Sequence, residues 1–295
     1  MNIIEIEGLT KKFKDMEALR GLSLQVPEGC VRGFLGRNGA GKTTTLKILL
    51  GMTRAGSGSA RVFGLDCADA AQSVAIRQRI GFVSETKALY PYMTIGETIR
   101  FTAGFFPKWR RDLEERYLKL FELPKNRGVA KLSKGTLSKL VLLLGMCRGA
   151  ELLILDEPTD GLDPAVTEDV LQAVVDLAAQ EGVTVFFSSH QLHEVEQIAD
   201  SVCIIEQGRT VLQSDLDDLR ASYRQVQLVF VDDAPRAGLQ RPGVERLQQS
   251  GRSVSLLVSR DVEGVVEAAR NHRATSINVR PVSLKEIFLS LVRVS

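Results

Sequence analysis

The sequence has little cysteine, no long apolar run and no recognisable leader at its N-terminus. Its four cysteines (Cys30, Cys67, Cys147 and Cys203) are far apart and form no CxxC pair, so we expect reduced, buried thiols rather than disulfides or a zinc site. The densest apolar run, residues 140–147, is far shorter than the ~18 residues that a membrane helix needs. Residues 1–9 carry two glutamates instead of a basic start and a hydrophobic block. These absences predict a cytosolic chain that does not span a membrane.

An excess of charge of one sign is also absent. The 38 lysines and arginines are balanced by 36 aspartates and glutamates, which leaves a formal net charge of +2. Without a strongly basic block, a nucleic-acid partner is not expected. The length of 295 residues suggests about two domains of roughly 150 residues each, enough for a sizeable core.

Alternating strand and helix patterns predict a parallel α/β core. An apolar strand at 31–35 runs into a glycine-rich loop, and residues 43–50 follow with helical spacing. The continuous apolar runs 152–155 and 183–187 suit strands of a sheet that is covered on both faces. Between these two strands we expect one helix, with Asp163 as its cap.

Further elements surround this core. We expect β structure at the N-terminus, a charged helical subdomain at about 94–148, and a hairpin at Gln207-Gly208. The N-terminal strands are expected at 2–7, around 19–26 and around 30–36, with the last two flanking a turn at 27–29.

The pattern changes near Ser214, which predicts a domain boundary there. We expect a first domain over 1–215 and a small accessory α+β domain over 216–295. The elements expected in the second domain are strands at 226–231, 253–258 and 277–279, a helix near 261–271 and a final helix from Ser283.

Residues 36–43 have the spacing GxxxxGK[ST], which is typical of a loop that binds phosphate groups. Its glycines let backbone N–H groups turn inward, and the following helix N-terminus adds a positive dipole. We expect Lys42 to reach the β- and γ-phosphates, Thr43 to offer a hydroxyl to Mg²⁺, and Thr44 to add a phosphate contact. The strand before and the helix after the loop argue against a chance glycine-rich turn. The expected nucleotide-binding residues of the loop are Gly36, Asn38, Gly39, Gly41, Lys42, Thr43 and Thr44.

Two acids follow the apolar run 152–155. Asp156 is placed to hold Mg²⁺ through water, and Glu157 to polarise the attacking water as a general base. The alternative is a pair of acids that caps a loop. The glycine loop upstream favours the catalytic interpretation.

Together with 132–136, Gly161-Leu162-Asp163 and Ser189-His190, these motifs resemble the ordered motifs of an ATP-binding cassette (ABC) transporter ATPase. The resemblance covers roughly residues 1–215. It implies a P-loop NTPase core of the ABC-ATPase type with an antiparallel β subdomain and a helical subdomain. It also implies ATP and Mg²⁺ as ligands, with ATP sandwiched in a head-to-tail dimer.

The resemblance assigns further roles, each with a plainer alternative. Phe13 falls where the family stacks an aromatic ring on adenine, although a core or edge role is also open. Ser133 begins the segment that meets the γ-phosphate of the opposite subunit, although it also suits a helix cap. Asp163 matches the loop that communicates between the two sites, and it also suits a cap. His190 matches the histidine that contacts the γ-phosphate and orients the water; a metal pair with His193 lacks a third ligand.

Three residues depart from the family pattern. The segment that acts across the dimer, Ser133 to Thr136, has Lys134 where a glycine is usual and Thr136 where a glutamine is usual, with Gly135 between them. We expect both changes to alter the affinity of the closed dimer. Glu85 replaces the glutamine that ligates magnesium and couples the site to the membrane partner. A carboxylate can still bind Mg²⁺ but lacks the amide donor, so we expect metal binding to survive and coupling to change; a solvated loop acid is the alternative.

The tail 281–289 resembles that of export-type and drug- or antibiotic-resistance ABC systems of bacteria. The resulting hypothesis is an ATP-hydrolysing subunit, homodimeric or paired with another ABC ATPase, that powers an exporter built of separate transmembrane permease subunits. It would act at the cytoplasmic face of the cell membrane. The alternative is a nucleotide-sensing regulatory ABC ATPase without transport. A DNA-associated ATPase fits less well, because a basic patch and a long coiled-coil insertion are both lacking.

Overall fold

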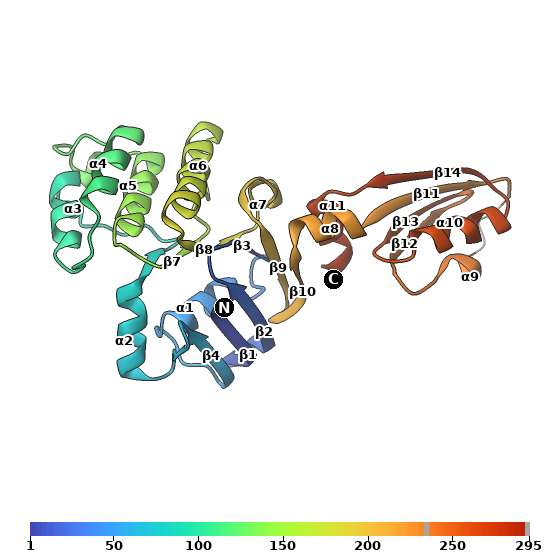
Figure 1. The fold of residues 1–295 in the computed structure, drawn as a ribbon, viewed down its shortest axis with the longest axis horizontal. Coiled ribbons are helices and arrows are strands. Elements are labelled where there is room, and N and C mark those ends of the chain that lie inside the picture. The colour runs from blue at the N-terminus through green and yellow to red at the C-terminus, as the bar shows by residue number, and fades with distance from the viewer. Residues whose placement is uncertain (233–235, 293–295) are drawn as a thin grey trace. The chain divides into compact units, whose positions relative to one another are not determined.

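The computed structural model of the protein describes residues 1–232 and 236–292 (Figure 1). The chain divides into two compact units, Met1–Gln213 and Ser214–Ser295, and each is described by itself. Among the helices of the described residues, none has both the length and the apolar character that a membrane span needs. All four cysteines are free, as predicted, and burial raises the pKa of Cys67 and Cys203 to about 12.

A six-stranded sheet forms the centre of the first unit, in the order β10-β9-β3-β8-β7-β6. The neighbouring pairs among β9, β3, β8, β7 and β6 are parallel, which confirms the predicted α/β core. β9 and β10 are joined by the predicted turn, in which Gln207 and Gly208 both have positive φ (47° and 74°). The strands are β3 (Val31–Leu35), β6 (Ile80–Val83), β7 (Leu152–Asp156), β8 (Thr184–Ser189), β9 (Ser201–Glu206) and β10 (Arg209–Asp215).

Helices pack on this sheet from both sides, as the fully buried strands β3, β7 and β8 require. The helices that contact its strands are α1 (Lys42–Leu49), α2 (Ala70–Arg79), α5 (Lys134–Met146), α6 (Pro164–Glu181) and α7 (Leu192–Ile198). α6 begins at Asp163, whose side chain accepts a hydrogen bond from the Val166 N–H, and ends at Gly182, as predicted for a capped helix.

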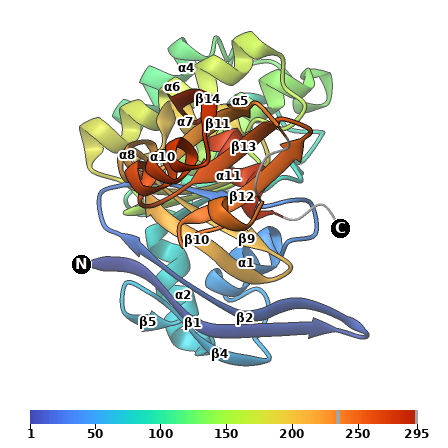
Figure 2. The ribbon, with the colours of Figure 1, turned by 90° about the vertical axis from the view of Figure 1, so that its right-hand side faces the viewer.

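A second, antiparallel sheet lies in the same unit, in the order β2-β1-β4-β5; Figure 2 shows β1, β2 and β4 side by side. Its strands are β1 (Asn2–Phe13), β2 (Met16–Pro27), β4 (Ser57–Val62) and β5 (Leu65–Asp66). The expected strand at 2–7 is therefore longer. The strands on either side of the turn at 27–29 do not pair, because β2 pairs with β1 whereas β3 enters the parallel sheet. One buried cluster, with Leu24, Phe34, Ile154 and Phe186, packs the two sheets together.

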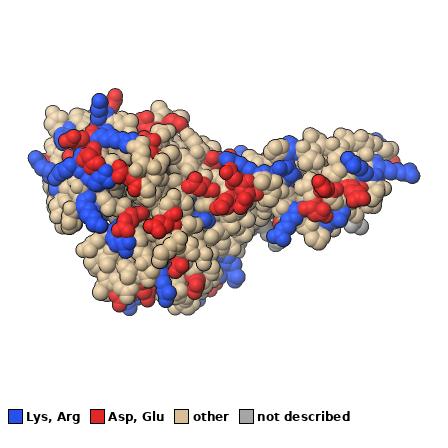
Figure 3. Space-filling view, in the orientation of Figure 1, with Lys and Arg blue, Asp and Glu red and all other residues tan. Residues whose placement is uncertain are grey.

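The helical region of the first unit contains α3 (Ile95–Ala103), α4 (Arg111–Leu120), the short 3₁₀ helix η1 (Val129–Lys131) and α5. Lysines and arginines are interspersed with acids over this region on the face shown in Figure 3. Several of these charges pair across elements: Arg116 of α4 bonds Asp176 of α6 at 2.8 Å, and Arg110 bonds Glu181 at 2.6 Å. The ion pairs hold the helical region against α6.

The second unit is an α+β domain, as predicted, with the sheet order β12-β13-β11-β14. Its β-α-β-β-α-β sequence of elements is that of ferredoxin-like folds. The elements are α8 (Leu216–Ser222), β11 (Arg224–Phe230), α9 (Arg236–Leu239), β12 (Val244–Ser250), β13 (Ser253–Val258), α10 (Val262–Asn271), β14 (Ala274–Pro281) and α11 (Leu284–Leu291). β12 was not predicted from the sequence, because Val244 and Leu247 are its only apolar residues.

Candidate functional site

The glycine loop connects β3 to α1 at the carboxyl end of the central sheet. Gly41 adopts φ 110°, and a Cβ at this position would lie 2.7 Å from Leu19 Cδ2 and 2.8 Å from the Ala18 carbonyl oxygen, so only glycine fits. Gly41 also stands at the N-cap of α1 and makes no side-chain cap. The first-turn N–H groups of α1 therefore face the cavity beside the loop, which is a suitable environment for an anion.

This cavity has a volume of about 510 Å³. One side is formed by Met16, Ala18 and loop residues between Arg37 and Thr44. The other side is formed by four ionisable side chains from separate segments: Glu85, Glu157, Asp160 and His190. The structure thus brings the predicted loop together with three predicted residues and with Asp160, which was not predicted.

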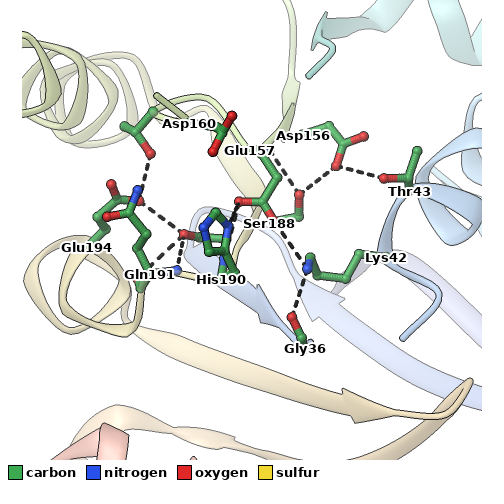
Figure 4. A network of polar contacts seen from close by, with 12 residues as sticks. Gly36, Lys42, Thr43, Asp156, Glu157, Asp160, Ser188, His190, Gln191 and Glu194 are labelled. Atoms are coloured by element: carbon green, nitrogen blue, oxygen red, sulfur yellow. Dashed lines mark hydrogen bonds and ion pairs between the residues drawn. The ribbon is translucent and has the colours of Figure 1, made fainter. Parts of the chain in front are cut away.

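Glu157 forms the centre of a charge network in which Lys42 and Glu157 are buried and His190 is exposed (Figure 4). Its Oε1 lies 3.1 Å from Lys42 Nζ, and its Oε2 lies 2.8 Å from His190 Nδ1. Lys42 also donates to the Gly36 carbonyl oxygen at 2.8 Å, and the backbone N–H of His190 donates to Glu157 Oε2 at 3.2 Å. Lys42 is 6% and Glu157 7% exposed, so their mutual attraction is little screened by water.

The backbone of Glu157 is strained. Its φ of 49° lies in the left-handed region, which a non-glycine residue rarely adopts and which costs about 1–3 kcal/mol. The Glu157 N–H donates to the Ser188 carbonyl oxygen at 3.2 Å and to Ser188 Oγ at 3.1 Å, which secures this conformation. Strain of this kind is concentrated at functional sites, and here it orients the carboxylate towards the cavity.

Asp156 lies beside Glu157 and next to the first turn of α1. Its Oδ1 accepts a hydrogen bond from Ser188 Oγ at 2.7 Å and one from Thr43 Oγ1 at 3.4 Å. A hydroxyl and a carboxylate are the oxygen donors that Mg²⁺ prefers, and Glu85 adds a further carboxylate to the cavity wall. No group of three or more histidine, cysteine or acidic residues suited to a metal occurs in residues 1–232 and 236–292. The residues present fit an ion that is bound by few side chains and completed by phosphate and water.

Glu194 lies behind this network and was missed in the sequence. The side chain is fully buried at the first turn of α7, where its Oε2 accepts hydrogen bonds from Thr159 Oγ1 at 2.7 Å and Ser189 Oγ at 3.1 Å. Desolvation raises the pKa of Glu194, and the two hydroxyl bonds oppose that shift. The only signal in the sequence was an acid four residues after His190.

Some predicted residues lie outside the cavity wall. Phe13, 42% exposed, is at the end of β1 with Lys11 Nζ 4.9 Å from its ring centre, and Met16, its register partner on β2, lines the cavity instead. Asp163 caps α6. The roles proposed for Phe13 and Asp163 therefore stay predictions.

The segment Ser133 to Thr136 is also outside the cavity of its own chain. Ser133 caps α5: its Oγ accepts the Thr136 N–H at 3.1 Å and lies 2.8 Å from Thr136 Oγ1. Lys134 Nζ lies 3.9 Å from Asp160 Oδ2, and a Cβ at Gly161 would fall 1.9 Å from that nitrogen. The added cation of this segment is therefore held beside the loop that follows Glu157.

Comparisons with known proteins place these features in a family. The family model described as ABC transporter matches residues 19–160. The bacitracin transport ATP-binding protein BcrA of Bacillus licheniformis is 33% identical, over 80% of this chain and 77% of the relative. The Nod factor export ATP-binding protein I of Ralstonia nicotianae is 30% identical, over 98% of this chain and 93% of the relative. A solved structure of an ATP-binding subunit of an ABC transporter is 28% identical with a TM-score of 0.67, covering 74% of this chain and 92% of that one.

Proposed function

The chain belongs to the ATP-binding proteins of ABC transporters and is an ATPase; from this premise we propose that it closes head to tail with a second copy, or with another ABC ATPase, to drive export through separate permease subunits. The observation that carries the proposal is the contact of Glu157 with both Lys42 and His190 at the cavity wall. The relative named for bacitracin transport supports a role in transport, and the relative named for Nod factor export supports the outward direction.

In the proposed reaction, Glu157 accepts a proton from the water that attacks the γ-phosphorus of ATP, and the bond to the β–γ bridging oxygen breaks. His190 holds the Glu157 carboxylate in place through Nδ1 and its backbone N–H. Lys42 and the first turn of α1 stabilise the negative charge on the phosphate oxygens. Thr43, Asp156 and Glu85 would hold Mg²⁺, which neutralises phosphate charge when it is bound.

Dimerisation is supported by the position of Ser133 to Thr136. This segment begins a helix, and a helix N-terminus suits an anion, yet it is outside the cavity of its own chain. A second chain is needed to bring such a segment over the γ-phosphate. In the same arrangement, Asp163 would lie between the two sites, and Phe13 would offer its exposed ring to adenine.

The permease partner is supported by an exposed row of aromatic rings in the helical region, which we call the aromatic row: Tyr92, Tyr90, Phe101 and Phe105. Successive ring centres are 5.6, 5.7 and 5.2 Å apart, and each side chain is between 45% and 76% exposed. Contiguous exposed apolar side chains mark interaction sites. The aromatic row follows Glu85 in the chain. A partner docked on the row would therefore contact the segment that leads on from the cavity wall. Docking would hold the subunit at the cytoplasmic face of the cell membrane.

A regulatory, nucleotide-sensing role is the second candidate. It is favoured by Lys134, which is engaged with Asp160 of its own chain, and by Thr136, which is engaged with Ser133. Against it is the complete Asp156, Glu157 and His190 set, which hydrolysis requires and which sensing alone does not.

Co-purification from detergent-solubilised membranes separates the two candidates. A stoichiometric hydrophobic partner supports transport, and a soluble assembly that depends on nucleotide supports regulation. Serine in place of both Tyr92 and Phe105 should abolish capture of the partner and leave basal ATP hydrolysis intact. Leu120→Ser is the matched control, because Leu120 is 45% exposed on α4 and lies outside the aromatic row.

A further inference from the structure

Glu194 is a fully buried acid without an ion pair among the residues that the structure describes. Both of its hydrogen bonds reach Oε2, and its Oε1 has no partner. An acid in such a place is unfavourable for stability, because a buried carboxylate loses its hydration. The hydroxyl bonds and the charge interaction with His193 oppose this loss only in part, so the pKa of Glu194 is still raised. If this residue only filled the core, an apolar side chain would stabilise the fold more than Glu194 does.

The two donors to Glu194 belong to the two segments that carry the charge network. Thr159 is 1% exposed and comes two residues after Glu157; Ser189 directly precedes His190. One carboxylate oxygen therefore connects the loop after β7 with the last residue of β8. Ser189 Oγ also accepts the Gln191 N–H at 2.9 Å, which extends this connection to the start of α7.

The helix that carries Glu194 is seated firmly on the central sheet. Val195 is fully buried, and a Cβ at Gly33 of β3 would lie 2.5 Å from Val195 Cγ1. Only the absence of a side chain at Gly33 lets α7 approach β3 so closely. Because β3 continues into the glycine loop, Glu194 is held in a fixed position relative to the cavity.

We propose that Glu194 is a positioning residue for ATP hydrolysis, which holds the loops of Glu157 and His190 at the separation that gives their 2.8 Å contact. The inference rests on the proposed roles of Glu157 and His190. Loss of the Glu194 acceptor leaves two buried hydroxyls unpaired and frees the two loops to move apart. Displacement of a reacting group by about 1 Å can lower a rate a hundredfold.

The test compares Glu194→Ala with Glu194→Gln in the full chain, by steady-state ATP hydrolysis and by binding of a fluorescent ATP analogue. Glu194→Ala should lower kcat about tenfold or more and leave KM and analogue affinity within about twofold, because the ATP-binding loop is untouched. Glu194→Gln should retain kcat within about threefold, because its amide oxygen still accepts both hydroxyls. Unchanged kcat in Glu194→Ala, or equal loss of kcat in the glutamine variant, would overturn the proposal.

Thr159→Val provides a milder variant that keeps the proposal testable if Glu194→Ala does not fold. It should lower kcat in the same direction and leave KM within about twofold, because it removes one of the two hydroxyls that the Glu194 carboxylate joins. An unchanged kcat in Thr159→Val would contradict the role of this contact. Ser201→Ala is the matched control: Ser201 is 2% exposed at the start of β9, and its loss should leave kcat unchanged.

Glu157→Gln, measured in parallel, separates failure of this inference from failure of the proposed function. Full turnover in Glu157→Gln would remove the proposed base, and with it the basis for a positioning residue. If Glu157→Gln does not hydrolyse ATP and Glu194→Ala is fully active, the role proposed for Glu194 is wrong and the role proposed for Glu157 stands.

Discussion

The N-termini of α1 and α5 both belong to motifs that the sequence assigns to phosphate binding, yet their surroundings differ. At α1 no side chain caps the helix, and its first turn lines the cavity. At α5, Ser133 caps the helix through the Thr136 N–H, and Lys134 lies beside Asp160 of the same chain. The N-terminus of α1 can therefore bind an anion within one chain. The N-terminus of α5 is already in contact with side chains of its own chain, and a phosphate would have to displace them.

The largest effect is expected from a substitution beside the N-terminus of α1 that abolishes ATP hydrolysis and keeps ATP binding. Glu157→Gln should bind ATP but lower hydrolysis about a hundredfold or more, because the amide cannot accept a proton from water. The variant should accumulate a dimer, measured by light scattering with ATP, since hydrolysis is the step that reopens it. A variant with full turnover would dismiss Glu157 as the base.

A second change removes the cation at the α1 end. Lys42→Ala should weaken ATP binding at least about tenfold and also destabilise the free protein by about 3–5 kcal/mol, because Glu157 then stays buried without its cation. Calorimetry and thermal melts measure the two effects. Lys47→Ala, an exposed lysine on the same helix, is the control and should change neither.

A third change removes the side-chain contacts at the N-terminus of α5. Replacing Lys134 by Gly and Thr136 by Gln removes the contact with Asp160 and the hydroxyl bond to Ser133. In a Glu157→Gln background, the dimer formed with ATP should then be several-fold tighter by sedimentation, because an exposed ion pair, worth about 0–1 kcal/mol, no longer competes with phosphate. Weaker dimers would show that Lys134 itself binds the phosphate. Lys131→Gly, just outside the segment, should leave the affinity unchanged.

The smallest effect is expected at Glu85, which lines the cavity that the N-termini of α1 and α5 would both face in the proposed dimer. Glu85→Gln should keep Mg²⁺-dependent hydrolysis and change turnover only a few-fold, because a carboxylate and an amide oxygen both ligate Mg²⁺ but only the amide donates a hydrogen bond. A Mg²⁺ titration of the ATPase measures both quantities. If neither the Mg²⁺ dependence nor the turnover changes, Glu85 is a solvated loop acid.

Much of the first unit could be predicted because its signals are local. The strand before Gly36, the helix after Gly41 and the cap at Asp163 depend on a few neighbouring residues. The strands β2 and β3 could not be assigned to their sheets from the sequence. Strand propensity is the same in either sheet, and the choice depends on partners far along the chain.

The sequence by itself determined the phosphate-binding loop, the acids after β7 and the parallel α/β core, because spacing and periodicity suffice for them. Only the tertiary structure placed Lys42 and His190 on the two oxygens of Glu157, Glu194 between Thr159 and Ser189, and Lys134 beside Asp160. These contacts join segments that are distant in the chain. Side-chain chemistry alone cannot show which buried acid meets which donor, since that is decided where the ends of β7 and β8, α1 and α7 meet.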